Sequence, residues 1–144
     1  MSWDKNKLIP LKEIEEMVTE ETVRFAKEFG AYLVTGVKNS VEPLTTSQLR
    51  KFFGEVKRQQ MTGYNETDFI MLKPKLAYAV GRTKKDRRKE YKIADFYLVL
   101  ADAIDKVGQC QDKEKAFKNF ITIFEAIVAY HKEKESEKET ENYL

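Results

Sequence analysis

Cysteine and histidine, which build most metal and redox sites, are almost missing from this 144-residue sequence. It contains one cysteine, Cys110, and one histidine, His131. A single cysteine cannot form an internal disulfide or a multi-cysteine zinc site, and a single histidine cannot form a histidine pair. We therefore expect no bound metal and no cofactor, and we place the protein in a reducing cytoplasm.

Long apolar runs are also absent. No stretch approaches the roughly 20 apolar residues that span a bilayer. The opening residues, MSWDKNKLIPLKEIEE, lack a basic leader followed by an apolar run. The sequence therefore predicts neither a membrane protein nor an exported one.

Helix-breaking residues are few, with 6 glycines and 3 prolines, and no segment alternates polar and apolar residues between hairpin turns. We expect an all-α protein with one domain over residues 1–144, a compact bundle of about five helices. The predicted helices cover residues 11–37, 45–60, 68–82, 88–107 and 113–133, and a charged, frayed tail follows from about residue 133. Gly30 is expected to divide the first helix, and Pro74 to lie in the first turn of the third.

Catalytic patterns are missing as well. GRTKK at residues 81–85 lacks the upstream glycine spacing of a phosphate-binding loop. Glu125, inside the apolar run ITIFEAIVAYHK, is interpreted as a structural carboxylate. His131 is expected at the exposed end of the last helix, where a positive charge would suit the helix dipole. The sequence therefore predicts a protein that is not an enzyme.

Charge is present in quantity and is unevenly placed. The net charge is only +2, but residues 50–92 hold 13 Lys or Arg against 5 Asp or Glu, an excess of eight positive charges. The rest of the chain carries an excess of six negative charges. This asymmetry indicates an anionic partner for the middle of the chain.

Residues 45–60, TTSQLRKFFGEVKRQQ, are predicted to form a two-sided helix that starts with a capping box between Thr45 and Gln48. At about 100° per residue, the apolar side chains share one arc facing the core: Leu49, Phe52, Phe53 and Val56. The opposite arc is almost entirely positive around Gly54: Arg50, Lys51, Lys57 and Arg58. A solvated helix face usually mixes both signs, because opposite charges four residues apart stabilise it.

The next two segments continue the positive charge. Lys75, Tyr78 and Arg82 form one stripe of the third helix, with a ring between two cations, as in sites that hold single-stranded nucleic acid. The predicted loop GRTKKDRRKEYK, residues 81–92, adds further candidates: Lys84, Lys85, Arg87 and Arg88. A merely solubilising loop and a tyrosine at the edge of the core remain alternative explanations. Three successive elements of the same sign favour anion binding, chiefly of nucleic acid.

Three phrases then occur in a distinctive order: LTTSQLRKFFGEVKRQ, LKPKLAYAVGR and FKNFITIFEAIVAYHK. Together, over residues 44–132, the sequence resembles the small helical subunit of the type III-A (Csm-type) CRISPR interference complex. The first 40 residues carry no phrase that matches this family.

The resemblance implies a non-catalytic protein that stacks in several copies beside other Csm-type subunits. It implies RNA binding in antiviral defence, with target RNA and crRNA within the effector complex as partners and no membrane. The family's basic helix maps onto Arg50, Lys51, Lys57 and Arg58, with Lys75 and Arg82 from the second phrase.

Two other hypotheses remain open at this point. One is a free-standing helical DNA-binding module, with the helix at residues 45–60 as its recognition helix; its face lacks the Asn, Ser and Thr that often read bases. The other is a pure scaffold whose basic face docks on an acidic protein.

Overall fold

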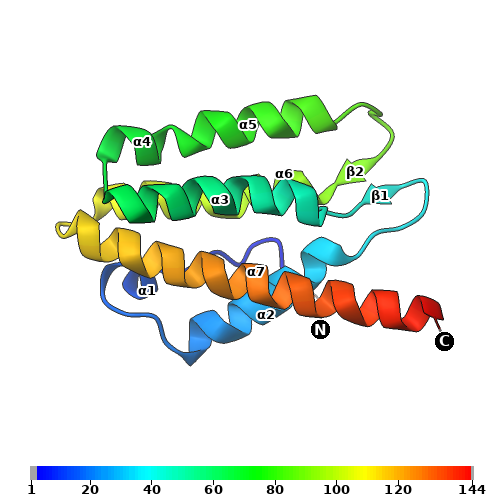
Figure 1. The fold of residues 1–144 in the computed structure, drawn as a ribbon, viewed down its shortest axis with the longest axis horizontal. Helices are drawn as coiled ribbons and strands as arrows, with labels where there is room; N and C mark the ends of the chain where they lie inside the picture. The colour runs from blue at the N-terminus through cyan, green and yellow to red at the C-terminus, as the bar shows by residue number, and fades with distance from the viewer. Residues whose placement is uncertain (1–2, 144) are drawn as a thin grey trace.

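The computed structural model describes the backbone of residues 3–143 and the side chains of residues 3–138. It is built almost entirely of helices (Figure 1): α1 (Leu11–Glu15), α2 (Glu20–Val34), α3 (Thr46–Thr62), α4 (Glu66–Ile70), α5 (Leu72–Thr83), α6 (Lys92–Gln109) and α7 (Lys113–Tyr143). The expected all-α bundle is confirmed. Among the described residues, no helix is both long enough and apolar enough to cross a membrane.

Helix α7 organises the bundle, because it runs the length of the molecule and packs against α1, α2, α3 and α6 (Figure 1). Helix α2 crosses one side of α7, whereas α3 and α6 lie on its other side. Helix α5 packs against α6 and forms, with α4, the outermost layer. Helices α3 and α5 therefore lie near one another without either burying the other's full length.

The core is rich in phenylalanine. The rings of Phe69 and Phe120 meet edge to face with centroids 5.0 Å apart, and Phe96 meets Phe124 in the same way at 5.8 Å. Edge-to-face contacts of this kind suit the ring quadrupoles and add to the energy of burial. Helices α6 and α7 together supply half of the buried core residues. Leu98, also on α6, is by contrast more than half exposed.

The predicted first helix is two helices, and the break does not fall at Gly30. It falls at residues 16–19, where the Glu13 carboxylate accepts hydrogen bonds from the Thr19 backbone N–H and hydroxyl and from the Thr22 hydroxyl, at 2.5–2.8 Å. Thr19 also caps the N-terminus of α2. These hydrogen bonds stabilise a turn, and the spacing of the apolar residues gives no sign of it.

Gly30 lies inside α2, where that helix crosses α7. A Cβ atom there would lie 2.9 Å from the Ile127 carbonyl oxygen and 2.9 Å from the His131 backbone nitrogen. The glycine therefore permits a close helix crossing rather than ending a helix.

The predicted third helix is also divided, into α4 and α5. The Asn65 side chain caps α4 by accepting a hydrogen bond from the Asp68 N–H at 3.0 Å, and a second start follows at Leu72. Pro74 lies in the first turn of α5, as expected, where its missing N–H costs no hydrogen bond.

The fourth helix begins at Lys92 rather than near residue 88, because residues 90 and 91 belong to a strand. The sequence shows no strand-type alternation, but the structure contains a short parallel pair: β1 (Val41–Glu42) pairs with β2 (Glu90–Tyr91), with Val41 opposite Glu90. Two-residue strands so distant along the chain leave no alternation to detect. The ladder ties the α2–α3 loop to the α5–α6 loop, and the ion pair Lys89–Glu42 adds to it at 2.9 Å.

The last helix continues far beyond residue 133. Helix α7 extends to Tyr143, and the Lys138 ammonium donates to the Val34 carbonyl oxygen at 3.3 Å. The tail expected from about residue 133 is thus helical to Tyr143, and Leu144 lies outside the described residues.

His131 is consequently not an exposed helix end. It is buried at mid-helix, with its Nε2 2.9 Å from the Leu44 carbonyl oxygen. This bond fixes the chain just before α3, and so it helps to position the basic helix.

Candidate nucleic-acid interface

The basic helix forms as the sequence predicts. The Thr45 hydroxyl accepts from the Gln48 N–H at 3.1 Å, and the Gln48 side chain accepts from the Thr45 N–H at 2.9 Å, which completes the capping box. Leu49 and Val56 are buried. Phe52 and Phe53 are half-buried, with Phe52 packed towards Phe96 of α6 and Phe53 towards Phe124 of α7. The opposite arc of α3 therefore faces outward.

The four cations of this arc form two flanks rather than one face. By helix geometry Arg50 and Lys57 lie on the flank beside α7, where the Lys57 ammonium pairs with Glu125 at 3.2 Å. Glu125 is thus an ion-pair partner on the surface. Lys51 and Arg58 lie on the flank beside α5.

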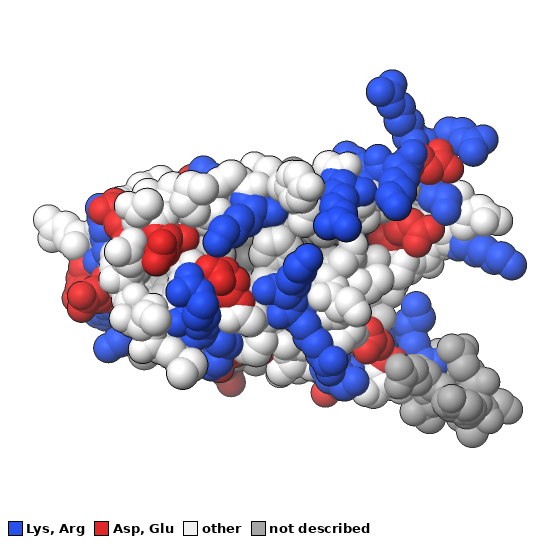
Figure 2. Space-filling view, turned by 45° about the horizontal axis from the view of Figure 1, so that its top comes forward, with Lys and Arg blue, Asp and Glu red and all other residues white. Residues whose placement is uncertain are grey.

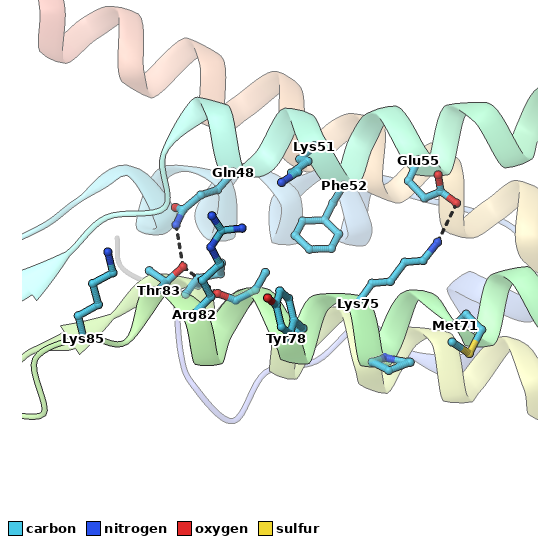
Figure 3. Close-up of a pocket in the computed structure, with 13 residues that line it drawn as sticks. Gln48, Lys51, Phe52, Glu55, Met71, Lys75, Tyr78, Arg82, Thr83 and Lys85 are labelled. Carbon is cyan, nitrogen blue, oxygen red and sulfur yellow. Dashed lines mark hydrogen bonds and ion pairs between the residues drawn. The ribbon is translucent and has the colours of Figure 1, made fainter.

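A groove runs between α3 and α5 (Figure 3), with a volume of about 960 Å³. Four sequence-predicted residues that line it come from three elements: Lys51 from α3, Lys75 and Arg82 from α5, and Lys85 from the following loop. Tyr78, the fifth, lies on the α5 wall and is 71% exposed. The fold therefore brings together residues up to 34 positions apart in sequence, counting from Lys51 to Lys85.

Further lining residues were not predicted as part of a site. They are mostly apolar: Phe52, Met71, Pro74, Ala79 and Ile93. Phe52 was assigned to the core, because a helical wheel alone cannot tell a side chain at the edge of a core from one that lines a groove. Because Phe52 is half-buried, it belongs both to the edge of the core and to the wall of the groove.

Among the residues whose side chains are described, Glu55 is the one carboxylate that lines the groove. It accepts two hydrogen bonds from the Arg58 guanidinium, at 2.7 and 3.0 Å, and it pairs with Lys75 across the groove at 3.4 Å. The hydrogen bond from Arg58 is the largest cause that lowers the pKa of Glu55 to about 2, with Gln59 and Lys75 contributing. At neutral pH its negative charge is offset by two cations of the predicted site.

A pH-dependent contribution to stability follows from this pKa. The folded-state pKa of Glu55 lies below the ordinary value of 4.5, so its stabilisation is present above pH 4.5 and is lost as the pH falls towards 2. We expect Glu55→Gln to lower the free energy of unfolding at pH 7 by about 1 kcal/mol, since the partner cations are half exposed and screened. Urea unfolding at pH 7 and pH 3 checks this, because the difference from wild type should shrink at the lower pH. Glu133→Gln, at an exposed position of α7, is the control and should show no such trend.

The basic side chains of the loop between α5 and β2 differ in whether their charge is free or paired. Lys84 and Arg87 are exposed, whereas the Arg88 guanidinium pairs with Asp86 at 3.2 Å. Lys92 does not belong to the surface: it is buried, and its ammonium donates to the Tyr32 carbonyl oxygen at 2.9 Å and to the Thr35 hydroxyl at 3.1 Å, at the end of α2. Burial lowers the pKa of Lys92 to about 8.

Some of the predicted cations are without an anionic partner. In the part of the chain whose side chains are described, no ion pair is formed by the following residues: Arg50, Lys51, Arg82, Lys84, Lys85 and Arg87. Figure 2 shows Lys and Arg side chains along both sides of a hollow and gathered at one end of the molecule, with fewer acidic side chains among them. This face therefore carries uncompensated positive charge.

The described residues hold no group of three or more His, Cys, Asp or Glu side chains placed to bind a metal ion. The fold and the groove define the class, a small helical protein with a cationic groove on one face. The Csm2 Type III-A family model matches residues 16–137, most of the chain, and the chain therefore belongs to that family. It is accordingly a small subunit of a type III-A CRISPR effector complex.

The match extends the resemblance seen over residues 44–132 back to α2, for which the sequence offered no recognisable phrase. No curated protein and no solved structure matches the chain.

Proposed function

We propose that the protein is a non-catalytic, RNA-binding small subunit that stacks in several copies within the cytoplasmic effector complex and contacts the backbone of the target RNA and of the crRNA. The observation that carries this proposal is the set of unpaired cations around the α3–α5 groove. Phosphates attract such charges without regard to sequence, and guide pairing would supply the sequence choice. The other Csm-type subunits and copies of this chain are its protein partners.

The arrangement of the cations favours a strand that follows the groove. Lys51, Arg82 and Lys85 border it, and Lys84 and Arg87 continue the charge along the loop at its end. Arg50 and Lys57 lie on the other flank of α3, with exposed Gly54 between the flanks. A Cβ atom at Gly54 would meet no protein atom within 4 Å, so the backbone is open to close approach by a phosphate.

The test removes charge without disturbing the fold. In complexes reconstituted with Arg50→Ala/Arg58→Ala, and separately with Lys51→Ala/Arg82→Ala, we expect weaker binding of unrelated target RNAs to a similar degree. Each lost phosphate contact should flatten the slope of log affinity against log salt by about 0.7. Because Arg58 is already paired with Glu55, the Lys51/Arg82 pair should give the larger loss. Binding by the isolated chain should be weak and should strengthen in the assembled filament.

A charge-matched control is Lys113→Ala/Lys118→Ala, at the start of α7. This double variant removes the same charge outside the groove and should leave the slope unchanged. An unaltered affinity and slope in both test variants would contradict the proposal. Negligible RNA affinity even at low salt would favour the scaffold hypothesis, and specific binding of one duplex DNA site would favour the DNA-binding module.

A further inference from the structure

The α3–α5 groove contains an aromatic slot with a defined frame. Phe52 projects into it from α3 and Tyr78 from α5 (Figure 3). Two polar bridges cross the groove on either side of these rings: the Gln48 amide donates to the Thr83 hydroxyl at 3.3 Å, and Lys75 pairs with Glu55 at 3.4 Å. The slot is the open part of the groove between the two bridges.

The two rings of the slot are not stacked on one another. Phe52 is tilted against Phe96 of the core, with centroids 6.3 Å apart, so the core holds it in place. Tyr78 makes no ring contact with any aromatic side chain in the described part of the chain, and it is 71% exposed. An exposed aromatic ring beside cations in a groove is the arrangement on which proteins stack the bases of single-stranded nucleic acids.

The floor of the groove is apolar, and binding of phosphate alone would not explain an apolar floor. Besides the two rings, the groove is lined by four apolar residues: Met71, Pro74, Ala79 and Ile93. A volume of about 960 Å³ is at the upper end of the range of pockets that enclose small organic ligands, about 300–1,000 Å³. A cationic border around an apolar floor is complementary to a ligand that joins an anion to a flat ring.

We propose that this slot receives one unpaired nucleobase of the RNA strand, stacked on Tyr78 and bordered by Phe52, while the adjoining phosphates lie on Lys51 and Arg82. The base must be unpaired, because bases within a duplex are already stacked and only splayed bases can reach an aromatic side chain. Stacking tolerates any base, since each has a π-face. The inference rests on the proposed function and adds to it which part of the RNA enters the groove.

The experiment separates the base from the backbone. Full-length protein is titrated at low salt with three labelled probes: a short single-stranded RNA, the same strand with abasic positions, and the matching duplex. We expect the intact strand to bind about 5- to 150-fold more tightly than the abasic strand, the fold-change that corresponds to one stacked base. The ratio should not vary with salt, because both strands carry the same phosphates.

Variants at position 78 locate the effect. Tyr78→Ala should abolish the preference for intact over abasic RNA, and Tyr78→Phe, which keeps the ring, should preserve it. A 2-aminopurine base in the strand should lose fluorescence on binding to wild type but not to Tyr78→Ala. The side chain is largely exposed, so both variants should unfold at the wild-type temperature.

Two outcomes would overturn the proposal. If the intact strand, the abasic strand and the duplex bind equally and Lys51→Ala/Arg82→Ala still weakens all three, the groove contacts phosphates only, and the proposed function stands without the base slot. If a photoreactive side chain at position 78 in the assembled complex cross-links to a protein subunit and not to RNA, a protein segment occupies the groove. Absence of any salt-dependent RNA affinity would instead overturn the proposed function itself.

Discussion

Replacing Phe124 with alanine should lower the free energy of unfolding by about 3–5 kcal/mol, the usual range for a buried phenylalanine. Its ring meets Phe53 at 5.6 Å, Phe96 at 5.8 Å and Phe120 at 6.1 Å, so it joins α3, α6 and α7. In a domain of this size the midpoint of thermal unfolding should fall by roughly 6–20 °C. Chemical denaturation followed by far-UV circular dichroism measures the change.

A pair of leucines two residues apart on α6 provides the control for core substitutions. Leu100 is buried, whereas Leu98 is more than half exposed. Leu100→Ala should therefore cost about 2–5 kcal/mol, and Leu98→Ala should stay within about 0.5 kcal/mol of wild type. Equal losses at the two positions would contradict the orientation of α6.

The second large effect is expected at Gly30. Gly30→Ala should destabilise the protein by about 1–3 kcal/mol, in the manner of an overpacked core, although alanine favours a helix over glycine by about 1 kcal/mol. The physical reason is that the added Cβ atom would lie 2.9 Å from backbone atoms of α7. Backbone atoms cannot move aside as the end of a long side chain can, so the two helices would have to separate.

Gly54→Ala is the matched comparison for Gly30→Ala, because both glycines are helical and Gly54 is unobstructed. It should stabilise the protein by about 0.5–1 kcal/mol through helix propensity alone. Urea denaturation of both variants shows directly whether each substitution raises or lowers the free energy of unfolding. A stabilising Gly30→Ala would show that α2 and α7 do not approach as closely as the structure has them.

The sequence alone was sufficient to predict the helical class, most of the core and the start of α3. Long amphipathic stripes such as Phe96, Leu100, Ile104 and Val107 repeat over several turns. Apolar spacing of that length is compatible with few structures other than a helix. The capping box at Thr45 is equally local, since both partners lie within four residues. The family phrases could be recognised because they are contiguous.

Tertiary structure decided the features that depend on partners distant along the chain. Gly30 was predicted to divide a helix and instead permits a helix crossing, because its neighbours lie about 100 residues away on α7. His131 was predicted at the surface and is buried against Leu44. The β1–β2 ladder joins residues about 50 positions apart, so no local sequence pattern predicts it.

The candidate site divides in the same way. The cations could be found from composition and helical spacing, because charge is a property of each residue by itself. Which of them remain unpaired could not, because Glu125 reaches Lys57 from α7 and Glu55 meets Lys75 across the groove. The groove itself exists because α3 packs against α7 while α5 packs against α6. Only this packing leaves Phe52 and Tyr78 projecting into an open space.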